Sequence, residues 1–396
     1  MKIALLVIYY LPSTESCVQL MYDLAHELKL RGHEPTVITV NSSIPTNVQM
    51  TDEQGIRVMR VRAGKIKGTT RYLRALTEFR LSRIIWAKAK AYLLEQPYDL
   101  IIYYSPSIFW GPLVRRLKQV FACKTYLILR DIFPQWYVDA GIIRKGCLYR
   151  YLKKKELENY DAADVIGVQS PANMEYFRTS GLKDRYKLEV LFNWSSLYQS
   201  GHIRYKVRGR LGLEEKIVFI YGGNMGVAQD MDNILRLAAR LRAEPRAYFL
   251  LVGDGSEVHR LKREVQKRNL RNVSIHPAVN QEEYMSMVSE CDIGLISLDR
   301  RLKTQNFPGK MLGYMYHAKP ILASINEGND LEEVLHAHVA GLVSHNGDDD
   351  TFYNHAMQLM RDPVLRQRMG KSGRMLLEER FSAPRAATQI LSHFTN

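Results

Sequence analysis

The chain has 396 residues, more than one hydrophobic core usually holds, so we expect two domains. Its 46% hydrophobic and 24% charged residues predict a soluble globular protein, and no apolar run approaches the ~18 residues needed to cross a bilayer. The net charge of +15 predicts an anionic partner: nucleic acid, an anionic membrane surface or a phosphorylated small molecule.

The cysteines and histidines indicate neither disulfides nor a metal site. The four cysteines are far apart, as reduced cytosolic thiols are, and no ligand cluster stands out among the 11 histidines. Residues 1–10 indicate a buried strand rather than a signal peptide, because they carry one Lys and no small-residue cleavage site follows.

The first half alternates apolar strands with helical segments, which predicts a parallel sheet. A helix over residues 16–31 and a strand over 35–40 follow the first strand. The first loop lacks GxGxxG, so we expect no dinucleotide there. Further strands are predicted at residues 100–104, 125–129, 165–168 and 188–191.

Two basic segments of the first half are rich in apolar residues. Residues 57–90 carry eleven Lys or Arg and one acid, and 142–155 form a second cluster. This pattern predicts a basic helix that lies against anionic lipid. The alternative is a solvated face over an ordinary core stripe. Between the segments, Arg130 and Asp131 follow a strand directly, which favours ligand contact. The alternative there is an Arg–Asp pair that ties down a loop.

The second half repeats the α/β pattern after an irregular stretch that ends near Leu213. Strands are predicted at residues 217–221, 249–252, 272–276, 293–296 and 320–323. Glycine-rich turns follow two of them, at 222–226 and 253–255, where a backbone could approach a charged ligand closely. A last helix near residues 384–394 could pack back on the first domain.

The stretch 305–333 predicts a diphosphate site. Lys310 follows Pro308 and Gly309 at one helix start, and residues 328–330 open the next helix. Helix starts after successive parallel strands meet at the carboxyl edge of a sheet, where anions bind. The alternative is that these residues form the ordinary turns and helix starts of an α/β fold and bind no ligand. No Ser-His-Asp order, Walker lysine or paired carboxylates are visible, so the chemistry would depend on positioning and phosphate electrostatics.

Together these segments resemble a known family over nearly the full length. The chain is similar to the retaining GT-B glycosyltransferases of family four, and most to the WbuB-type transferases of O-antigen and capsule synthesis, which are associated with N-acetyl-L-fucosamine. The resemblance implies an α/β fold with two Rossmann-like doubly wound domains facing across a cleft. They would span residues 1–195 and 196–380, with a helix at 381–396 packing on the first. The segments that carry it are residues 131–141, 187–194, 222–230, 252–255, 307–315 and 328–331.

The resemblance also implies residue roles. Lys310 would neutralise the leaving diphosphate, and Arg130 and Asp131 would face the sugar or the acceptor as the other catalytic residues. The remaining expected contacts belong to the donor: Gly222, Gly223, Asn224, Gly226 and Gln229 at the diphosphate, Gly253, Asp254 and Gly255 near the base, Pro308 and Gly309 beside Lys310, and Glu327, Gly328, Asn329, Asp330 and Leu331 through backbone amides.

Three departures from the family pattern concern the binding residues. Gln305 and Gly313 stand where the Glu-x7-Glu carboxylates are usual, so ribose recognition must come from elsewhere, with Glu332 or Glu333 as candidates. Asn224 and Gln229 stand near the usual phosphate-clamping Arg and Lys, which leaves Lys303 and Arg301 as reserve cations. The usual His of the first domain is replaced around residues 104–106.

The resulting expectation is a metal-independent, retaining enzyme without a cofactor. It would transfer N-acetyl-L-fucosamine from a UDP-sugar to a polyprenyl-diphosphate-linked saccharide. It would be cytoplasmic and peripheral on the anionic inner face of the cell membrane. The alternatives are a nucleotide-sugar epimerase of the same fold, which needs carboxylates to move a proton, and a basic nucleic-acid-binding protein, which needs base-stacking aromatics or a recognised module.

Overall fold

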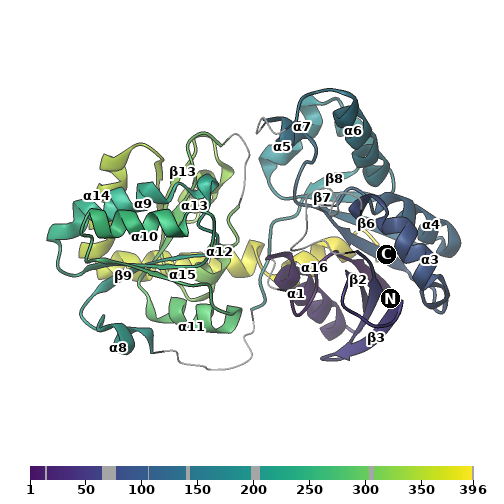
Figure 1. The fold of residues 1–396 in the computed structure, drawn as a ribbon, viewed down its shortest axis with the longest axis horizontal. Helices are drawn as coiled ribbons and strands as arrows, with labels where there is room; N and C mark the ends of the chain where they lie inside the picture. Colours follow the sequence, from purple (N-terminus) through teal and green to yellow (C-terminus); the bar gives the residue numbers. More distant parts are fainter. Residues whose placement is uncertain are drawn as a thin grey trace. The chain divides into compact units, whose positions relative to one another are not determined.

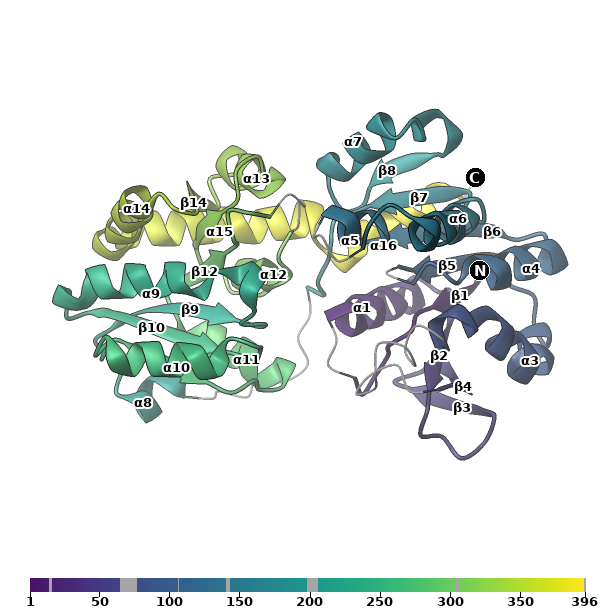
Figure 2. The same ribbon diagram turned by 45° about the horizontal axis from the view of Figure 1, so that its top comes forward.

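The computed structural model describes residues 1–13, 16–64, 77–105, 107–139, 143–197, 206–302 and 307–394. Its chain divides into two compact units, each a sheet covered by helices (Figures 1 and 2). The first unit comprises Met1–Asn193 with Ala383–Asn396, and the second comprises Trp194–Ser382. Sequence placed the boundary at residue 195 and the last helix in the first domain. The predicted class, two Rossmann-like α/β sheets, is confirmed.

The sheet of the first unit has the order β3-β4-β2-β1-β5-β6-β7-β8, and only β3 runs antiparallel to its neighbour. Its strands are β1 Lys2–Leu6, β2 Glu34–Asn41, β3 Val48–Glu53, β4 Ile56–Arg62, β5 Leu100–Tyr104, β6 Lys124–Leu129, β7 Val165–Val168 and β8 Leu188–Val190. Its helices are α1 Ser16–Leu30, α3 Leu81–Leu94, α4 Gly111–Phe121, α5 Gln135–Asp139, α6 Cys147–Tyr160, α7 Pro171–Thr179, the 3-10 turn Lys183–Arg185 and α16 Ala383–Leu391.

Helix α16 returns to the first unit and packs against α1. Arg31, just after α1, donates hydrogen bonds to Thr388 Oγ1 at 2.9 Å and to the Pro384 carbonyl oxygen at 2.7 Å. On the other side, the Gln389 amide donates to the Val190 carbonyl oxygen at the end of β8. The last helix is therefore held by α1 and β8 of the first unit.

Part of the expected basic helix is a strand. Residues 56–62 form β4, which pairs with β2 and, in a hairpin, with β3. Residues 58–61 are all buried between the exposed Arg57 and Arg62, and the β-branched valines at 58 and 61 favour a strand. Residues 77–79 are helical, α3 begins at Leu81, and residues 65–76 lie outside the described part of the chain.

The sheet of the second unit has the order β11-β10-β9-β12-β13-β14, and all neighbours are parallel. Its strands are β9 Ile217–Gly222, β10 Ala247–Val252, β11 Val273–His276, β12 Ile293–Ser297, β13 Ile321–Ile325 and β14 Gly341–His345. Its helices are α8 Val207–Leu211, α9 Met231–Arg240, α10 Val258–Lys267, α11 Gln281–Glu290, α12 Lys310–Tyr316, α13 Asp330–Ala337, α14 Asp349–Arg361 and α15 Pro363–Arg380, with 3-10 turns at Val227–Gln229 and Leu241–Ala243.

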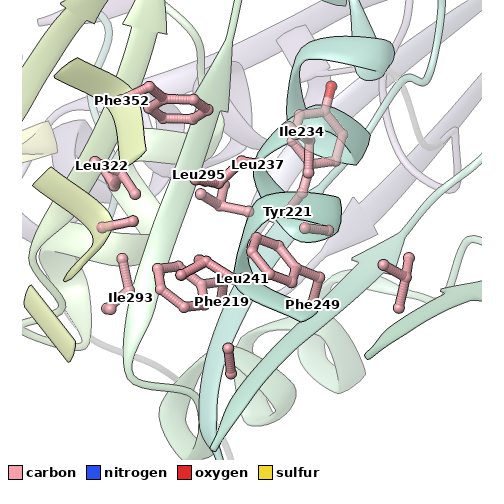
Figure 3. Close-up of a cluster of buried hydrophobic side chains, with 14 of the residues drawn as sticks. Phe219, Tyr221, Ile234, Leu237, Leu241, Phe249, Ile293, Leu295, Leu322 and Phe352 are labelled. Carbon is pink, nitrogen blue, oxygen red and sulfur yellow. The ribbon is translucent and has the colours of Figure 1, made fainter. Parts of the chain in front are cut away.

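The centre of this sheet is buried on both faces, as its apolar strands require. Phe219 of β9 and Phe249 of β10 stack with ring centroids 4.8 Å apart (Figure 3). The chain runs from β9 outward to β11, then returns to β12 on the other side of β9 and proceeds to β14. The carboxyl ends of β9 and β12 therefore form the topological switch point, where ligands bind to such sheets. Strand β14 was not predicted, since its five residues include two polar ones.

Helix α12, which begins with Lys310, is held in place by α15. A Cβ atom at Gly370 of α15 would lie 1.9 Å from the carbonyl oxygen of Ala318, just after α12. Backbone therefore meets backbone at this point, and only glycine fits. Gly373, three residues later in the same helix, has no atom closer than 3.6 Å to such a Cβ.

This difference gives a matched pair of substitutions. We expect Gly370→Ala to lower the free energy of unfolding by at least about 2 kcal/mol, because the helices must separate. Gly373→Ala should be neutral or stabilising by up to about 1 kcal/mol, because Ala favours helix. Urea unfolding followed by circular dichroism measures both. Equal effects would show that the α12–α15 contact does not constrain the unit.

Candidate functional site

The site at the switch point begins with two glycine-rich loops in direct backbone contact. The Gly223 N–H donates to the Val252 carbonyl oxygen at 2.9 Å, and the Met225 N–H donates to that of Asp254 at 2.7 Å. Gly253 has φ +154°, and a Cβ there would lie 1.9 Å from the Gly223 carbonyl oxygen. Loops 222–226 and 253–255 therefore pack without intervening side chains, as their sequences predicted.

Side chains fix the shape of the first loop. Gly222 lies over Tyr284, whose ring a Cβ would overlap at 2.0–2.3 Å. The Gln229 side-chain oxygen accepts hydrogen bonds from Asn224 Nδ2 at 3.0 Å and from the Gly226 N–H at 3.1 Å. Asn224 and Gln229 thus lie at the loop as predicted, but they bind each other and the backbone.

Lys310 lies beside this loop. Its Nζ is 3.7 Å from the centroid of the Tyr221 ring, and its Cε lies 3.8 Å from a Cβ built on Gly223. Tyr221 also donates from its hydroxyl to the Asn224 carbonyl oxygen at 2.6 Å. The same tyrosine therefore holds both the cation and the loop.

The Lys310 ammonium has no carboxylate partner among the described residues. Desolvation lowers its pKa from 10.5 to about 7. At neutral pH such a lysine is only partly protonated. A bound anion would take the place of the missing water and favour the protonated, charged form. The cation that sequence analysis identified is therefore poised to bind an anion beside the glycine-rich loop.

The second helix start is organised by Asn329. Its side chain is buried, accepts the Leu331 N–H at 3.1 Å and donates to Asn326 Oδ1 at 3.0 Å. The Leu331 amide is therefore not free for a ligand, contrary to the prediction, and its side chain is buried in the core. Glu327 and Gly328 are exposed, with Gly328 at φ +70°, so the loop itself remains accessible.

The remaining second-unit candidates have other environments. Asp254 is exposed and accepts the Gly255 N–H, while Pro308 is half-buried and Gly309 is exposed directly before α12. Asp330 is half-buried at the first turn of α13.

The position of the second family carboxylate is closely packed here. A Cβ at Gly313 would lie 3.1 Å from Met285 Sδ, so a larger side chain requires the Met285 side chain of α11 to shift. Gln305 lies outside the described residues.

Two of the reserve candidates are engaged elsewhere, whereas Glu333 is exposed. Glu332 binds His345 Nε2 at 3.0 Å, and the Arg301 guanidinium binds Asp299. Lys303 lies outside the described residues.

In the first unit, Arg130 is a structural residue. Its guanidinium is only 8% exposed and donates to the carbonyl oxygens of Leu191 at 2.5 Å and Phe192 at 3.3 Å. It is also hydrogen-bonded to Tyr104, one of the residues where the usual His is absent. Arg130 therefore holds the segment after β8, as the alternative expected of a loop, but through backbone carbonyl oxygens and Tyr104.

Asp131 differs from its neighbour because its side chain is exposed. Desolvation by the surrounding protein raises the pKa of the Asp131 carboxyl, and the charge of the Arg130 guanidinium opposes this rise. It therefore remains the first-unit candidate for ligand contact.

Sequence reasoning missed a cavity in the first unit. It has a volume of about 410 Å³ and follows the carboxyl ends of β1 and β2, with Tyr9, Tyr10, Asn41 and Arg60 in its wall. Arg60 is fixed by Glu53 of β3, a strand that the sequence did not reveal. The only available signal was the position of Tyr9 and Tyr10 directly after the first predicted strand.

The two doubly wound units and this switch-point site define a protein of the GT-B glycosyltransferase architecture. Family models match both units: "Glycosyl transferases group 1" matches residues 204–375, and "Glycosyl transferase 4-like domain" matches residues 18–194. The chain belongs to the group 1 glycosyltransferases, with their 4-like domain as its first unit. The predicted family is thereby confirmed at this level.

Individual relatives are more distant. The chain is 26% identical over 223 residues to the probable glycosyltransferase WbjE of Pseudomonas aeruginosa, covering 55% of each protein. It is 27% identical over 226 residues to WcaI of Escherichia coli, a putative colanic acid biosynthesis glycosyl transferase, covering 54% of each. The chain thus spans about half the length of these curated relatives. Anabaena HepE in complex with UDP-glucose has a TM-score of 0.71 and 16% identity, covering 99% of both chains.

The environment of Lys310 predicts an unusual titration. After reductive ¹³C-methylation, we expect one lysine signal to titrate near pH 7 by NMR, far below the ordinary lysine pKa of about 10.4, because burial lowers the pKa of Lys310. The Lys310→Arg variant should lose this signal alone, and Lys319→Arg, which replaces another half-buried lysine, should retain it. Titration of every lysine above about pH 9 would show that the ammonium is hydrated.

Proposed function

We propose that this chain is a glycosyltransferase of bacterial surface polysaccharide synthesis that takes its sugar from a UDP-sugar. The observation that carries the proposal is the position of Lys310 over the Tyr221 ring and beside Gly223. A desolvated cation without a carboxylate partner, next to backbone that permits close approach, suits a diphosphate. The UDP-glucose of the HepE structure supports this class of donor, and the description of WcaI as a putative colanic acid biosynthesis glycosyl transferase supports the pathway.

The proposed reaction exchanges one bond at the anomeric carbon of the sugar for another. The bond to the β-phosphate oxygen breaks, and a bond to the acceptor hydroxyl oxygen forms. Negative charge develops on the leaving diphosphate, where the Lys310 cation stabilises it. The leaving phosphate oxygen takes the proton of the attacking hydroxyl on the same face, which retains the anomeric configuration. This scheme uses no side-chain base, cofactor or metal.

The finer proposal concerns the two substrates. We infer N-acetyl-L-fucosamine as the sugar and a polyprenyl-diphosphate-linked saccharide as the acceptor. The resemblance of the six segments to the WbuB-type transferases supports the sugar. A lipid-linked acceptor implies a peripheral position on the inner membrane face, which the net charge of +15 supports. Within the described residues, no helix is long and apolar enough to cross a membrane.

An epimerase of the same fold is the nearest rival. It needs a carboxylate that is free to move a proton near the sugar. Within the described part of the second unit, Glu332 is paired with His345, and Asp254 accepts the N–H of Gly255. Gly313 supplies no carboxylate either, whereas Glu327 and Glu333 are exposed, so the product of the transfer assay decides between the two reactions.

A transfer assay tests the proposal and the role of Lys310 together. The full chain is incubated with UDP-sugars and a synthetic lipid-diphosphate sugar, and mass spectrometry and NMR identify the product and its anomeric configuration. We expect transfer from a UDP-N-acetylated deoxysugar with retention, in the presence of EDTA. Lys310→Ala should lower turnover by about 100-fold or more, because the leaving group loses its cation.

The pH dependence of this assay gives the control. Above pH about 7 the Lys310 ammonium of the free protein is deprotonated, so donor affinity should fall as pH rises. Lys310→Arg, whose guanidinium stays charged, should bind the donor equally from pH 6.5 to about 9. The proposed function would be overturned if no UDP-sugar supported transfer and none raised the melting temperature of the protein.

Substitutions of the adjacent residues Arg130 and Asp131 should have different effects, one on stability and the other on transfer. Asp131→Asn should leave the melting temperature within about 1 °C, since the side chain is exposed. It should lower transfer about tenfold or more, because the carboxylate is proposed to position the sugar or the acceptor. Arg130→Met should destabilise the fold by about 2 kcal/mol or more, because two carbonyl oxygens lose their buried donor. Unchanged kinetics in a stable Asp131→Asn protein would make this carboxylate structural.

A further inference from the structure

Three exposed apolar side chains gather on the first unit. Phe79, Leu148 and Tyr151 are 42%, 59% and 39% exposed. The rings of Phe79 and Tyr151 lie 6.1 Å apart, which joins the segment before α3 to helix α6. Phe79 also contacts the ring of Phe109 edge-on, so the patch is anchored to the core. Leu148 precedes Tyr151 by three residues in α6, and both therefore lie on one face of the helix.

Six exposed cations lie close in sequence to these side chains. Arg80 and Arg83 follow Phe79, Arg144 and Lys145 precede α6, and Arg150 and Lys154 flank Tyr151 within α6. None of these six forms an ion pair with another described residue.

The acidic residues of α6 are engaged elsewhere. Glu156 is fully buried and binds Lys153, and Glu158 binds Lys155. The face that carries Leu148 and Tyr151 therefore presents uncompensated positive charge.

We propose that this face, defined as Phe79, Leu148 and Tyr151 with the six cations close to them in sequence, binds the surface of an anionic phospholipid bilayer. Apolar and aromatic side chains enter the boundary between headgroups and acyl chains, while Lys and Arg contact the phosphates. Each cation near such a surface contributes about a fivefold gain in affinity. The aliphatic Leu148, the most exposed of the three, favours lipid over nucleic acid, which offers no apolar phase.

Binding through this face would place the transferase on the membrane that carries a lipid-linked acceptor, and this biological role rests on the proposed function. Binding to the bilayer does not depend on the proposed function, because neither donor nor acceptor takes part. The residues of the face are separate from Lys310 and Asp131. Failure of one proposal therefore leaves the other testable.

Sedimentation of the full chain with vesicles tests the face. We expect binding to phosphatidylcholine vesicles that contain phosphatidylglycerol and much weaker binding to phosphatidylcholine alone. Leu148→Glu should reduce affinity about tenfold, and the double variant Arg150→Glu, Lys154→Glu at least about 25-fold. Val364→Glu, an equally polar change at a residue of the second unit that is 72% exposed, should bind like the unchanged protein.

Cys147 supplies a direct probe of insertion. Its thiol is exposed beside Leu148, whereas Cys123 and Cys291 are buried. In a Cys17→Ser background, an environment-sensitive fluorophore on Cys147 should shift to shorter wavelength with anionic vesicles. The same fluorophore at Val364→Cys, in a protein that also carries Cys147→Ser, should not shift.

Several outcomes would overturn the proposal. They are equal binding to neutral and anionic vesicles, unchanged binding by both face variants, and a Cys147 probe that stays in water. Tighter binding to a DNA duplex than to anionic vesicles at the same salt, lost in the Arg150→Glu, Lys154→Glu variant, would assign the face to nucleic acid. Melting curves of each variant exclude unfolding as the cause.

Discussion

The candidate site of the second unit is built around one desolvated charge, the Lys310 ammonium over the face of Tyr221. Removal from water costs this group part of its charge, and the lowered pKa expresses that cost. The aromatic face compensates only partly, since a cation–π contact is worth about 1–2 kcal/mol. A carboxylate would compensate more fully, but it would also compete with an anionic ligand. The absence of a described acid beside Lys310 therefore keeps this cation available.

Backbone contacts hold the surroundings of this charge. Tyr221 binds the carbonyl oxygen of Asn224, so the residue that faces the cation also shapes the glycine-rich loop. That loop is fixed against Gly253 with no room for a side chain, and Gly370 fixes α12 in the same way. Close-packed backbone has few alternative arrangements, so Lys310 and the loop keep their positions without a ligand. A preorganised cation need not reorganise as charge develops on a leaving group.

Much of this could be read from sequence, for physical reasons. Apolar runs of four to six residues are too short for most helices, and helical segments between them favour buried parallel strands, so the two sheets were predictable. Glycines after strands likewise located both loops. Contacts between distant residues were not predictable: nothing in the spacing places Tyr221 against Lys310 or closes Gly313 against Met285. Arg130 looked like a ligand residue because its carbonyl partners lie far along the chain.

The basic charge illustrates the same limit. The sequence showed two segments rich in both cations and apolar residues. It predicted that the charged and the apolar side chains lie together on the surface of one helix. The structure separates them: Leu81 and Ile85 of α3 are fully buried, while Phe79 before the helix is exposed. The ring contact between Phe79 and Tyr151 then joins the exposed parts of both segments. A folded chain buries apolar surface that it can pack, so the apolar side chains left exposed among cations on one face carry more information than the charge of the whole protein.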